Sequence, residues 1–254
     1  MTDLSEATQP VTTGAPQGSA GRRWWQPFLR RLPWWGEALV AVVFYLLYDA
    51  VQALTQGDAP AATAHSLDIV HAERWLHIFA EPDVNRWATH HHWISLLAGY
   101  DYGIAHVLVT AAVLAFLWWR HPRVEVALRN AVVGLSLVAL LVYWLYPVSP
   151  PRFVVPGLTD TLTHNDILGA RHSYKGFVNL YAAMPSLHVA WAIWCAAALV
   201  LVLRSRWRHL AWLYPCATTF VVVSTANHYF LDAVAGAVFA AAALALSRSR
   251  LRSS

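Results

Sequence analysis

The sequence predicts an all-α, polytopic membrane protein built as a six-transmembrane-helix bundle. Hydrophobic residues make up 57% of the 254 residues and charged residues only 13%, whereas a soluble domain carries about 25% charged residues. Apolar stretches close to the length of about 20 residues that a helix needs to cross the bilayer core occur six times. The expected spans are Gly36–Leu54, Tyr100–Trp119, Asn130–Tyr146, Pro185–Leu203, Leu210–Ala226 and Tyr229–Leu246.

The placement of the arginines predicts how these spans are oriented. Arginines gather before the first span, between the second and third, between the fourth and fifth, and after the sixth, so all four groups can lie on one side. The positive-inside rule makes that side cytoplasmic, which places both termini in the cytoplasm and the longer loops at 55–99 and 147–184 outside. The groups are Arg22, Arg23, Arg30 and Arg31; Arg120, Arg123 and Arg129; Arg204, Arg206 and Arg208; and Arg248, Arg250 and Arg252.

The chain divides into one membrane domain, residues 34–247, and two flanking segments. Residues 1–33 are predicted to be a disordered cytoplasmic tail, because the first 20 are rich in Thr, Gln, Pro, Gly and Ser. Residues 248–254 are predicted to be a basic cytoplasmic tail. Membrane orientation explains the net charge of +4, so no nucleic-acid partner is expected. Cys195 and Cys216 lie in apolar runs and are interpreted as packing residues.

The first outer loop has a helical pattern of apolar residues, which predicts an amphipathic segment lying along the membrane interface. Three consecutive histidines, residues 90–92, follow this segment. A metal site is one interpretation of that run, but no second cluster of ligands with metal-binding spacing accompanies it. A solvated loop is therefore the favoured interpretation. The amphipathic pattern comprises Leu67, Val70, Trp75, Ile78 and Phe79.

The first candidate for chemistry is the pair His228 and Asp232, four residues apart at the start of the sixth span. That spacing places two side chains on one face of a helix, one turn apart. A charged group inside the membrane costs about 2.5–3.5 kcal/mol, so Asp232 requires a partner. A carboxylate on one imidazole nitrogen fixes the tautomer and makes the other nitrogen a better nucleophile. A purely structural His–Asp pair is the alternative.

The second candidate is the run from Ala183 to His188, which opens the fourth span. Proline is favoured at the first position of a helix, so we expect the helix to begin at Pro185. The first amides of such a helix have no helical acceptors and attract anions. Ser186 can add a hydrogen bond to a phosphate oxygen, and His188, about one turn further on, can protonate a leaving oxygen. The alternative is an ordinary helix start with an interfacial histidine.

The third candidate is Arg152, which follows the prolines that end the third span. Those prolines stop the helix and hold the backbone extended, so Arg152 is expected at the outer mouth of the bundle. A planar guanidinium suits bidentate binding of phosphate. An arginine that merely reaches for the interface is the alternative. The orientation of the spans places all three candidates at the same outer membrane level, which favours one phosphate site.

These motifs resemble the type 2 phosphatidic acid phosphatase superfamily. Ala183 to His188, then Asn227 to Gly236, preceded by Pro150-Pro151-Arg152, are most similar to its inositolphosphotransferase branch, which includes the inositol phosphorylceramide synthases. The resemblance covers roughly residues 36 to 246. It implies that His228 is the nucleophile that becomes phosphohistidine, Asp232 its orienting carboxylate and His188 the acid for the leaving group. It also implies that Ser186 and Arg152 bind phosphate.

The sequence departs from the wider superfamily at two positions of the phosphate pocket. The usual lysine seven residues before Arg152 is replaced by Leu145, and the usual arginine six residues before His228 is replaced by Val222. Both replacements remove positive charge, which fits the inositolphosphotransferase branch. Arg171 and Lys175, in the same outer loop, are expected to supply charge instead.

The expected function is that of a lipid phosphotransferase or phosphatase in a bacterial cell membrane, with a lipid phosphate as substrate. Hydrolysis alone, as in a lipid-phosphate or prenyl-diphosphate phosphatase, is the first alternative, because only the acceptor differs. No metal or other cofactor is expected, since no cluster of carboxylates accompanies these residues. A transporter is a remote alternative, because the sequence shows no internal repeat. A serine hydrolase using Ser186 and His188 is poorer, because residues two apart on a helix do not face each other.

Overall fold

The computed structural model describes residues 31–55, 58–170 and 181–252, and every regular element in those ranges is a helix. The predicted all-α class is therefore confirmed. In chain order the elements are α1 (Trp34–Thr55), α2 (Ala59–Trp75), α3 (Glu81–His90), α4 (His92–Tyr100), the π-helix η2 (Asp101–Ala105), α5 (His106–Arg120), α6 (Pro122–Leu145), α7 (Pro151–Val154), α8 (Thr161–His164), η3 (Ile167–Gly169), α10 (Leu187–Val202), η5 (Arg206–Trp212), α11 (Leu213–Ser224) and α12 (Phe230–Arg252).

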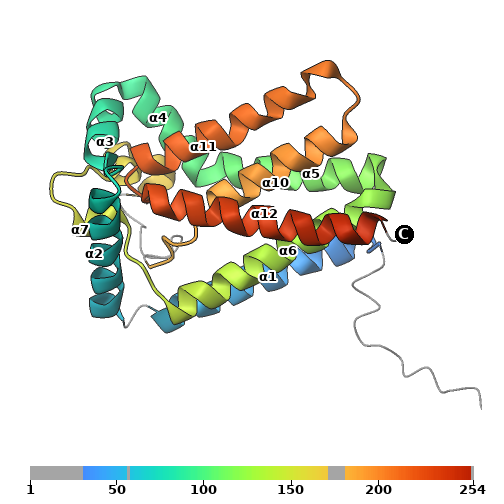
Figure 1. Ribbon diagram of the computed structural model, residues 1–254, viewed down its shortest axis with the longest axis horizontal. Helices are drawn as coiled ribbons and strands as arrows, with labels where there is room; N and C mark the ends of the chain where they lie inside the picture. Colours follow the sequence, from blue (N-terminus) through green and yellow to red (C-terminus); the bar gives the residue numbers. More distant parts are fainter. Residues whose placement is uncertain (1–30, 56–57, 171–180, 253–254) are drawn as a thin grey trace, which may run out of the picture.

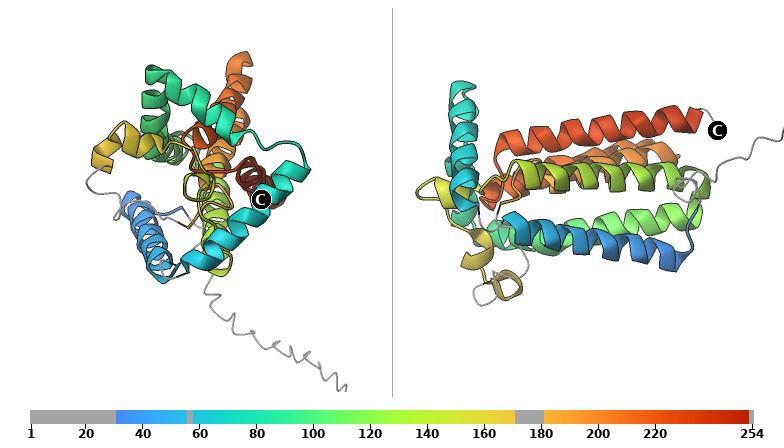
Figure 2. Two further views of the ribbon diagram at one scale, coloured as in Figure 1. Left: turned by 90° about the vertical axis from the view of Figure 1, so that its left-hand side faces the viewer. Right: turned by 90° about the horizontal axis from the view of Figure 1, so that it is seen from below.

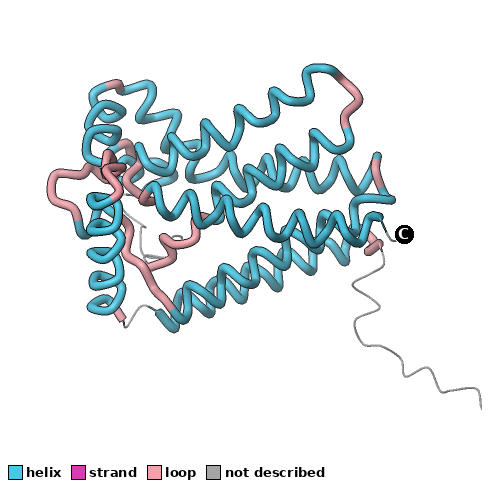
Figure 3. Tube along the Cα trace, viewed as in Figure 1, coloured by secondary structure: helices cyan, strands magenta, loops and turns pink. Residues whose placement is uncertain are grey.

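The long helices run alongside one another, and α2 and α3 lie across one end of this bundle (Figure 1). Two further views show the same arrangement, with α2 at a steep angle to α6 and α12 (Figure 2). The loops around α7 and before α10 gather at this end (Figure 3), whereas α1 begins and α12 finishes at the opposite end. Segments expected outside the membrane thus share one end of the molecule.

Among the described residues, four helical segments are long and apolar enough to cross a membrane: Trp34–Leu54, His92–Arg120, Pro122–Leu145 and Phe230–Ser247. The second is longer than predicted, because α4, η2 and α5 continue into one another. α10 is apolar but shorter, at 16 residues, and α11 has 12. These helices indicate an integral membrane protein. The predicted six membrane crossings would require that α10 and α11 also cross the membrane, and this remains a prediction.

The main apolar core lies where α10 packs against α5, α6 and α12. Trp194 of α10 is fully buried there, and its indole N–H donates to the carbonyl oxygen of Leu128 on α6 at 2.9 Å. Leu117 of α5 and Ala240 of α12 complete the same cluster with no exposed surface. Because α10 is central, the position of its first turn is fixed relative to both α6 and α12.

The expected amphipathic segment of the first outer loop is α2. Ile69 and Val70 of α2 are buried in a second apolar cluster together with Tyr229, while Trp75 is 79% exposed. The helix begins after Asp58 with a proline in its first turn, which needs no amide partner there. The buried side of α2 therefore packs directly on the residues that precede α12.

α1 is the least embedded of the four apolar helices, because only 6% of its apolar 18-residue stretch is buried. An ion pair joins it to α6: Nη1 of Arg129 lies 2.6 Å from Oε1 of Glu37 and 3.5 Å from Oε1 of Glu125. Arg129 and Glu125 are almost fully buried, so each charge requires the other. This cluster fixes α1 against the bundle at the end opposite α2.

Candidate active site

His228 lies in the turn between α11 and α12, not on a helix as its spacing from Asp232 had indicated. The amides of Asn227 and His228 both donate to the carbonyl oxygen of Val222, at 3.2 and 3.1 Å. Ala226, just before them, has a φ of 56°, a left-handed conformation that is uncommon for a residue with a side chain. Asp232 then falls in the first turn of α12. The four-residue spacing still brings the two side chains together, across the start of the helix.

Two acceptors orient the His228 ring. Nδ1 of His228 lies 2.7 Å from the carbonyl oxygen of Ala183 and 3.4 Å from Oδ2 of Asp232. A carbonyl oxygen only accepts, so Nδ1 carries the hydrogen and Nε2 is the nitrogen with the free lone pair. Asp232 has no exposed surface, and its Oδ2 also accepts from the amide of Tyr229 at 2.9 Å. The Ala183 carbonyl was not predicted, because a backbone group leaves no mark in the sequence.

The first turn of α10 is tied to α12 through Ser186. The helix begins at Leu187, two residues later than predicted, because Ser186 has an extended ψ of 107° and acts as the N-cap. Its hydroxyl accepts from the amide of Val189 at 3.5 Å, and its own amide donates to the carbonyl oxygen of Asp232 at 3.0 Å. Pro185 therefore lies before the helix, where its carbonyl oxygen accepts from the Tyr143 hydroxyl at 2.6 Å.

His188 lies in the first turn of α10, beside the π-helix η2. Its Nε2 is 3.2 Å from the carbonyl oxygen of Tyr102, and its ring stacks on the Tyr102 ring with centroids 4.2 Å apart. The ring of His106 is 3.9 Å from it, between centroids. A π-helical turn within an α-helix often occurs at functional sites. The sequence analysis did not identify Tyr102 and His106 as site residues. Two polar rings inside an apolar span are nevertheless a signal that could have indicated them.

Both histidines line one cavity of about 270 Å³, and their ring centroids are 5.6 Å apart. Aromatic side chains of α1 form the opposite part of the lining, and neither Ser186 nor Arg152 contributes to it. Such a cavity offers two imidazoles within reach of one small group and apolar surface around them. Its principal aromatic lining residues are Phe44, Tyr45, Tyr48, Tyr102, Tyr143 and Trp191.

Arg152 is held against the turn that carries His228. It lies in the single turn of α7, and its Nη1 donates to Oδ1 of Asn227 and to the carbonyl oxygen of Ala226. Its Nε is 3.5 Å from Oδ2 of Asp160, and only 1% of the side chain is exposed. The arginine is thus fixed by the residue next to His228. Asn227 and Asp160 are further site residues, of which the motif contained only the first.

The other residues of the predicted phosphate pocket are two cations and two apolar replacements. Arg171 and Lys175 fall outside the described residues. Val222 is fully buried in an apolar cluster with Val189 and Val223, and Leu145 is 65% exposed at the end of α6. Neither position places a cation near His228, as the sequence had indicated.

The histidine run lies at the exposed junction of α3 and α4. Nδ1 of His90 bonds to the carbonyl oxygen of Arg86, and Nδ1 of His91 bonds to that of Trp87, each at 2.7 Å. Within 31–55, 58–170 and 181–252, no three His, Cys, Asp or Glu side chains gather closely enough to hold a metal ion. His90 and His91 instead bond to carbonyls of the preceding turn.

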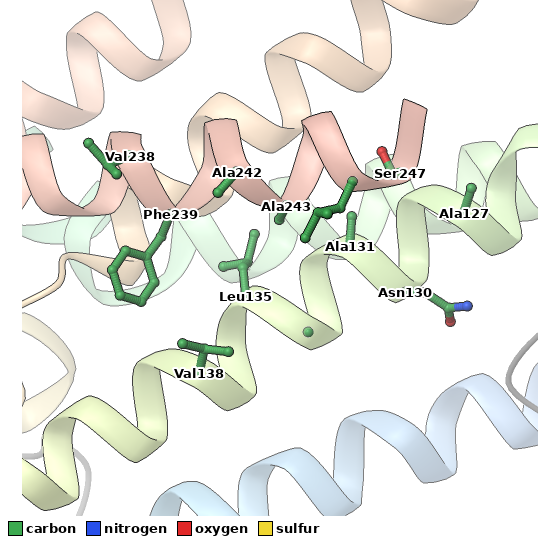
Figure 4. A pocket seen from close by; sticks show the side chains of 12 residues that line it. Ala127, Asn130, Ala131, Leu135, Val138, Val238, Phe239, Ala242, Ala243 and Ser247 are labelled. Carbon is green, nitrogen blue, oxygen red and sulfur yellow. The ribbon is translucent and has the colours of Figure 1, made fainter. Parts of the chain in front are cut away.

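A larger cavity, of about 460 Å³, lies between α6 and α12 (Figure 4). Leu135 and Val138 of α6 face Phe239 and Ala243 of α12 across it. Its lining includes no ionisable side chain, so it offers no group for phosphate chemistry. The cavity that holds the two histidines is therefore the candidate active site.

The sequence profile of the PAP2 superfamily matches residues 67–246, a range that contains His188, His228, Asp232 and Arg152. The match covers more than half of the chain, so the protein belongs to the PAP2 superfamily. Membership indicates a membrane enzyme of the lipid phosphatase or phosphotransferase type. No curated protein and no solved structure matches the chain significantly.

Proposed function

We propose that this protein transfers the phosphoryl group of a lipid phosphate through a phosphohistidine formed on Nε2 of His228. The observation that carries the proposal is the pairing of Nδ1 with Ala183 and Asp232, which makes Nε2 the nitrogen available for attack in a cavity shared with His188. An imidazole fixed in one tautomer by a carbonyl and a carboxylate is an activated nucleophile. Family membership supplies the matching reaction class.

The reaction proceeds in two steps. Nε2 of His228 attacks phosphorus, and the bond between phosphorus and the ester oxygen breaks while His188 gives that oxygen a proton. Water or a lipid hydroxyl then attacks the phosphohistidine, His188 takes the proton of the acceptor, and Nε2 of His228 leaves. The two rings are 5.6 Å apart between centroids, a separation that accommodates a group placed between them.

Positive charge and backbone amides stabilise the phosphoryl oxygens in this proposal. Arg152 is positioned by Asn227, the neighbour of His228, and the first amides of α10 begin at Ser186. Arg171 and Lys175 are the further cations proposed to act here. Because Ser186 caps its own helix, its hydroxyl has to turn from Val189 to reach a phosphate oxygen.

The acceptor proposed first is a lipid or polyol hydroxyl, as in the inositolphosphotransferase branch. Leu145 and Val222 support it, because both lack the positive charge of the wider superfamily and thus match that branch. Hydrolysis alone is the second candidate, and the chemistry up to the phosphohistidine is identical.

The proposed setting is a bacterial cell membrane crossed six times, with cytoplasmic termini and the site on the outer face. In support, α2, α3, α7 and the start of α12, which begins two residues after His228, lie at one end of the bundle, and the start of α1 and the end of α12 lie at the other (Figure 1). A site at this end opens to the headgroup region that lipid phosphates occupy.

The decisive test is covalent labelling. Purified protein incubated with a lipid carrying a labelled phosphate is expected to gain label that is stable in base and lost in acid, as a phosphoramidate is. His228→Ala should gain none, whereas His90→Ala, an exposed histidine of the run at residues 90–92, should label like the wild type. Label retained in His228→Ala would refute the assignment. Adding inositol phospholipid and ceramide then separates transfer from hydrolysis by the product formed.

A further inference from the structure

Three consecutive backbone amides at the start of α12 each donate to a different carboxylate. The first amides of a helix have no helical acceptor and carry the positive end of the helix dipole, so a carboxylate there is stabilising. One acceptor is the predicted Asp232, and the other two come from the helices that lie across the bundle end. The pairs are Tyr229 N with Asp232 Oδ2 at 2.9 Å, Phe230 N with Glu81 Oε1 at 3.1 Å, and Leu231 N with Glu73 Oε1 at 2.8 Å.

Glu73 of α2 and Glu81 of α3 have no exposed surface. Their second oxygens are also buried and reach no N–H or O–H group of the described chain. Two buried carboxyl groups that cap adjacent amides repel each other when both are ionised, so one proton held between them is favoured. Burial and the neighbouring Glu81 raise the pKa of Glu73 from 4.5 to about 9.

We propose that Glu73 and Glu81 act as a carboxylic acid–carboxylate pair that positions His228 and Asp232 by holding the start of α12. This inference rests on the proposed function, since the step that they support is the attack by His228. Neither carboxyl touches the reacting atoms. They act through the backbone: α12 begins two residues after His228, and Asp232, within its first turn, lies 3.4 Å from Nδ1 of His228. A shift of α12 therefore moves both partners of the nucleophile.

Negative charge surrounds Glu73 on two sides. Glu81 faces it from α3 and Asp232 acts on it from α12. α7, which also packs against α2, carries Arg152, but that side chain is held by Asn227 and Asp160. Loss of the shared proton therefore sets like charges against each other, which pushes α2 and α3 away from α12.

The test compares three variants across a range of pH. Glu73→Gln keeps an oxygen for the Leu231 amide and an N–H for Glu81, so it imitates the protonated acid without ionising. Glu73→Ala removes both contacts. Asp83→Asn, two residues from Glu81 but with an 80% exposed side chain, is the matched control.

We expect Glu73→Ala to lower kcat about 10²-fold with little change in KM, because a displaced reacting group costs about that much. Glu73→Gln and Asp83→Asn should keep the wild-type kcat at neutral pH. Wild-type and Asp83→Asn activity should fall above about pH 9, as the shared proton is lost, and Glu73→Gln should not show this fall. Unchanged kcat in Glu73→Ala, or the same alkaline fall in Glu73→Gln, would overturn the proposal.

Thermal unfolding gives a readout that does not depend on the reaction. Glu73 binds its proton more tightly when folded, so between pH 4.5 and about 9 the folded state holds more protons and loses stability as pH rises. Glu73→Gln should flatten this decline relative to Asp83→Asn. A decline equal to wild type in Glu73→Gln would refute the pair. If wild type forms no phosphoenzyme, the proposed function fails, while unfolding still decides whether the pair holds α12.

Discussion

Arg152, a proposed phosphate-binding residue, is held by contacts to two separate segments of the chain. Its guanidinium spans Asn227, Ala226 and Asp160 at once, and only a planar group with several donors can do so. These contacts fix the guanidinium against the turn that carries His228. The motif prediction identified the arginine and contained Asn227, but it gave Asn227 no orienting role and did not contain Asp160.

Arg152→Lys is expected to lower kcat/KM about 10- to 100-fold, because hydrogen bonds to charged groups are worth about 1.5–3 kcal/mol. The ammonium group of lysine is a single point of charge, so it cannot make the several directed contacts that the guanidinium makes. Steady-state kinetics with a short-chain lipid phosphate measures the change. Arg86→Lys, at an exposed arginine paired with Asp83, is the control. Kinetics of Arg152→Lys equal to that control would contradict the role of Arg152.

His188 is predicted to matter according to the leaving group. His188→Ala should slow the first step by about 10²–10⁴-fold for an alkyl phosphate, whose oxygen needs a proton to depart. Nitrophenyl phosphate leaves as a stable anion, so the first step should be far less affected. Release of the alcohol or phenol in a single turnover measures both. An equal loss for the two substrates would remove His188 from the acid role.

Several residues that set the site could not be predicted from local pattern. The carbonyl of Ala183 lies 45 residues from His228, and Glu81 and Glu73 lie 149 and 158 residues from their amide partners. Such pairs depend on which helices cross, and no spacing rule reports that. His228, Asp232, His188 and Arg152 were accessible because ionisable residues in apolar surroundings stand out in any sequence.

At the scale of elements, α12 passes very close to the residues that start α10. A Cβ on Gly236 of α12 would overlap the carbonyl oxygen of Ser186. The absence of a side chain there lets Ser186 N–H reach the carbonyl oxygen of Asp232. Glycine thus brings the turn with His228 near the helix with His188.

Gly236→Ala is expected to destabilise the fold by about 1–3 kcal/mol and to lower activity, because a backbone oxygen cannot move aside easily. Gly134→Ala in α6 is the matched control: nothing lies within 4 Å of its added Cβ, and alanine favours a helix over glycine by about 0.5–1 kcal/mol. Thermal unfolding and labelling of His228 measure both variants. If Gly236→Ala is as stable as the control, α12 and the start of α10 are not in close contact at this position.

The apolar segments were predicted well and their ends less so. Each of the six expected spans coincides with a helix, because a long apolar run specifies a helix irrespective of its partners. Ends depend on single capping contacts. Ser186, rather than Pro185, starts α10, since its amide is bonded to Asp232 in another helix. Similarly, the second span begins at His92 rather than at the predicted Tyr100. Polar residues near its start made the apolar run look shorter than the helix is.

At the scale of the whole molecule, the prediction that can fail most clearly is orientation. With Cys216, the exposed free cysteine, replaced by alanine, a single cysteine is introduced on either side. A membrane-impermeant maleimide added to intact cells should label Thr63→Cys in α2 and not Ser205→Cys between α10 and α11. Both positions are exposed. Labelling of Ser205→Cys alone would invert the orientation and place the site on the cytoplasmic face.

The carboxyl groups of Glu81 and Glu73 are synthesised 149 and 158 residues before the amides of Phe230 and Leu231 to which they bond. During synthesis, α2 and α3 therefore leave the ribosome with two carboxyl groups that have no amides to cap until α12 is made. The site forms only once α12 has been inserted, since Asp232 and the capped amides belong to its first turn and His228 lies two residues before it. A chain truncated before residue 227 is thus expected to insert in the membrane without the proposed nucleophile and its carboxylate.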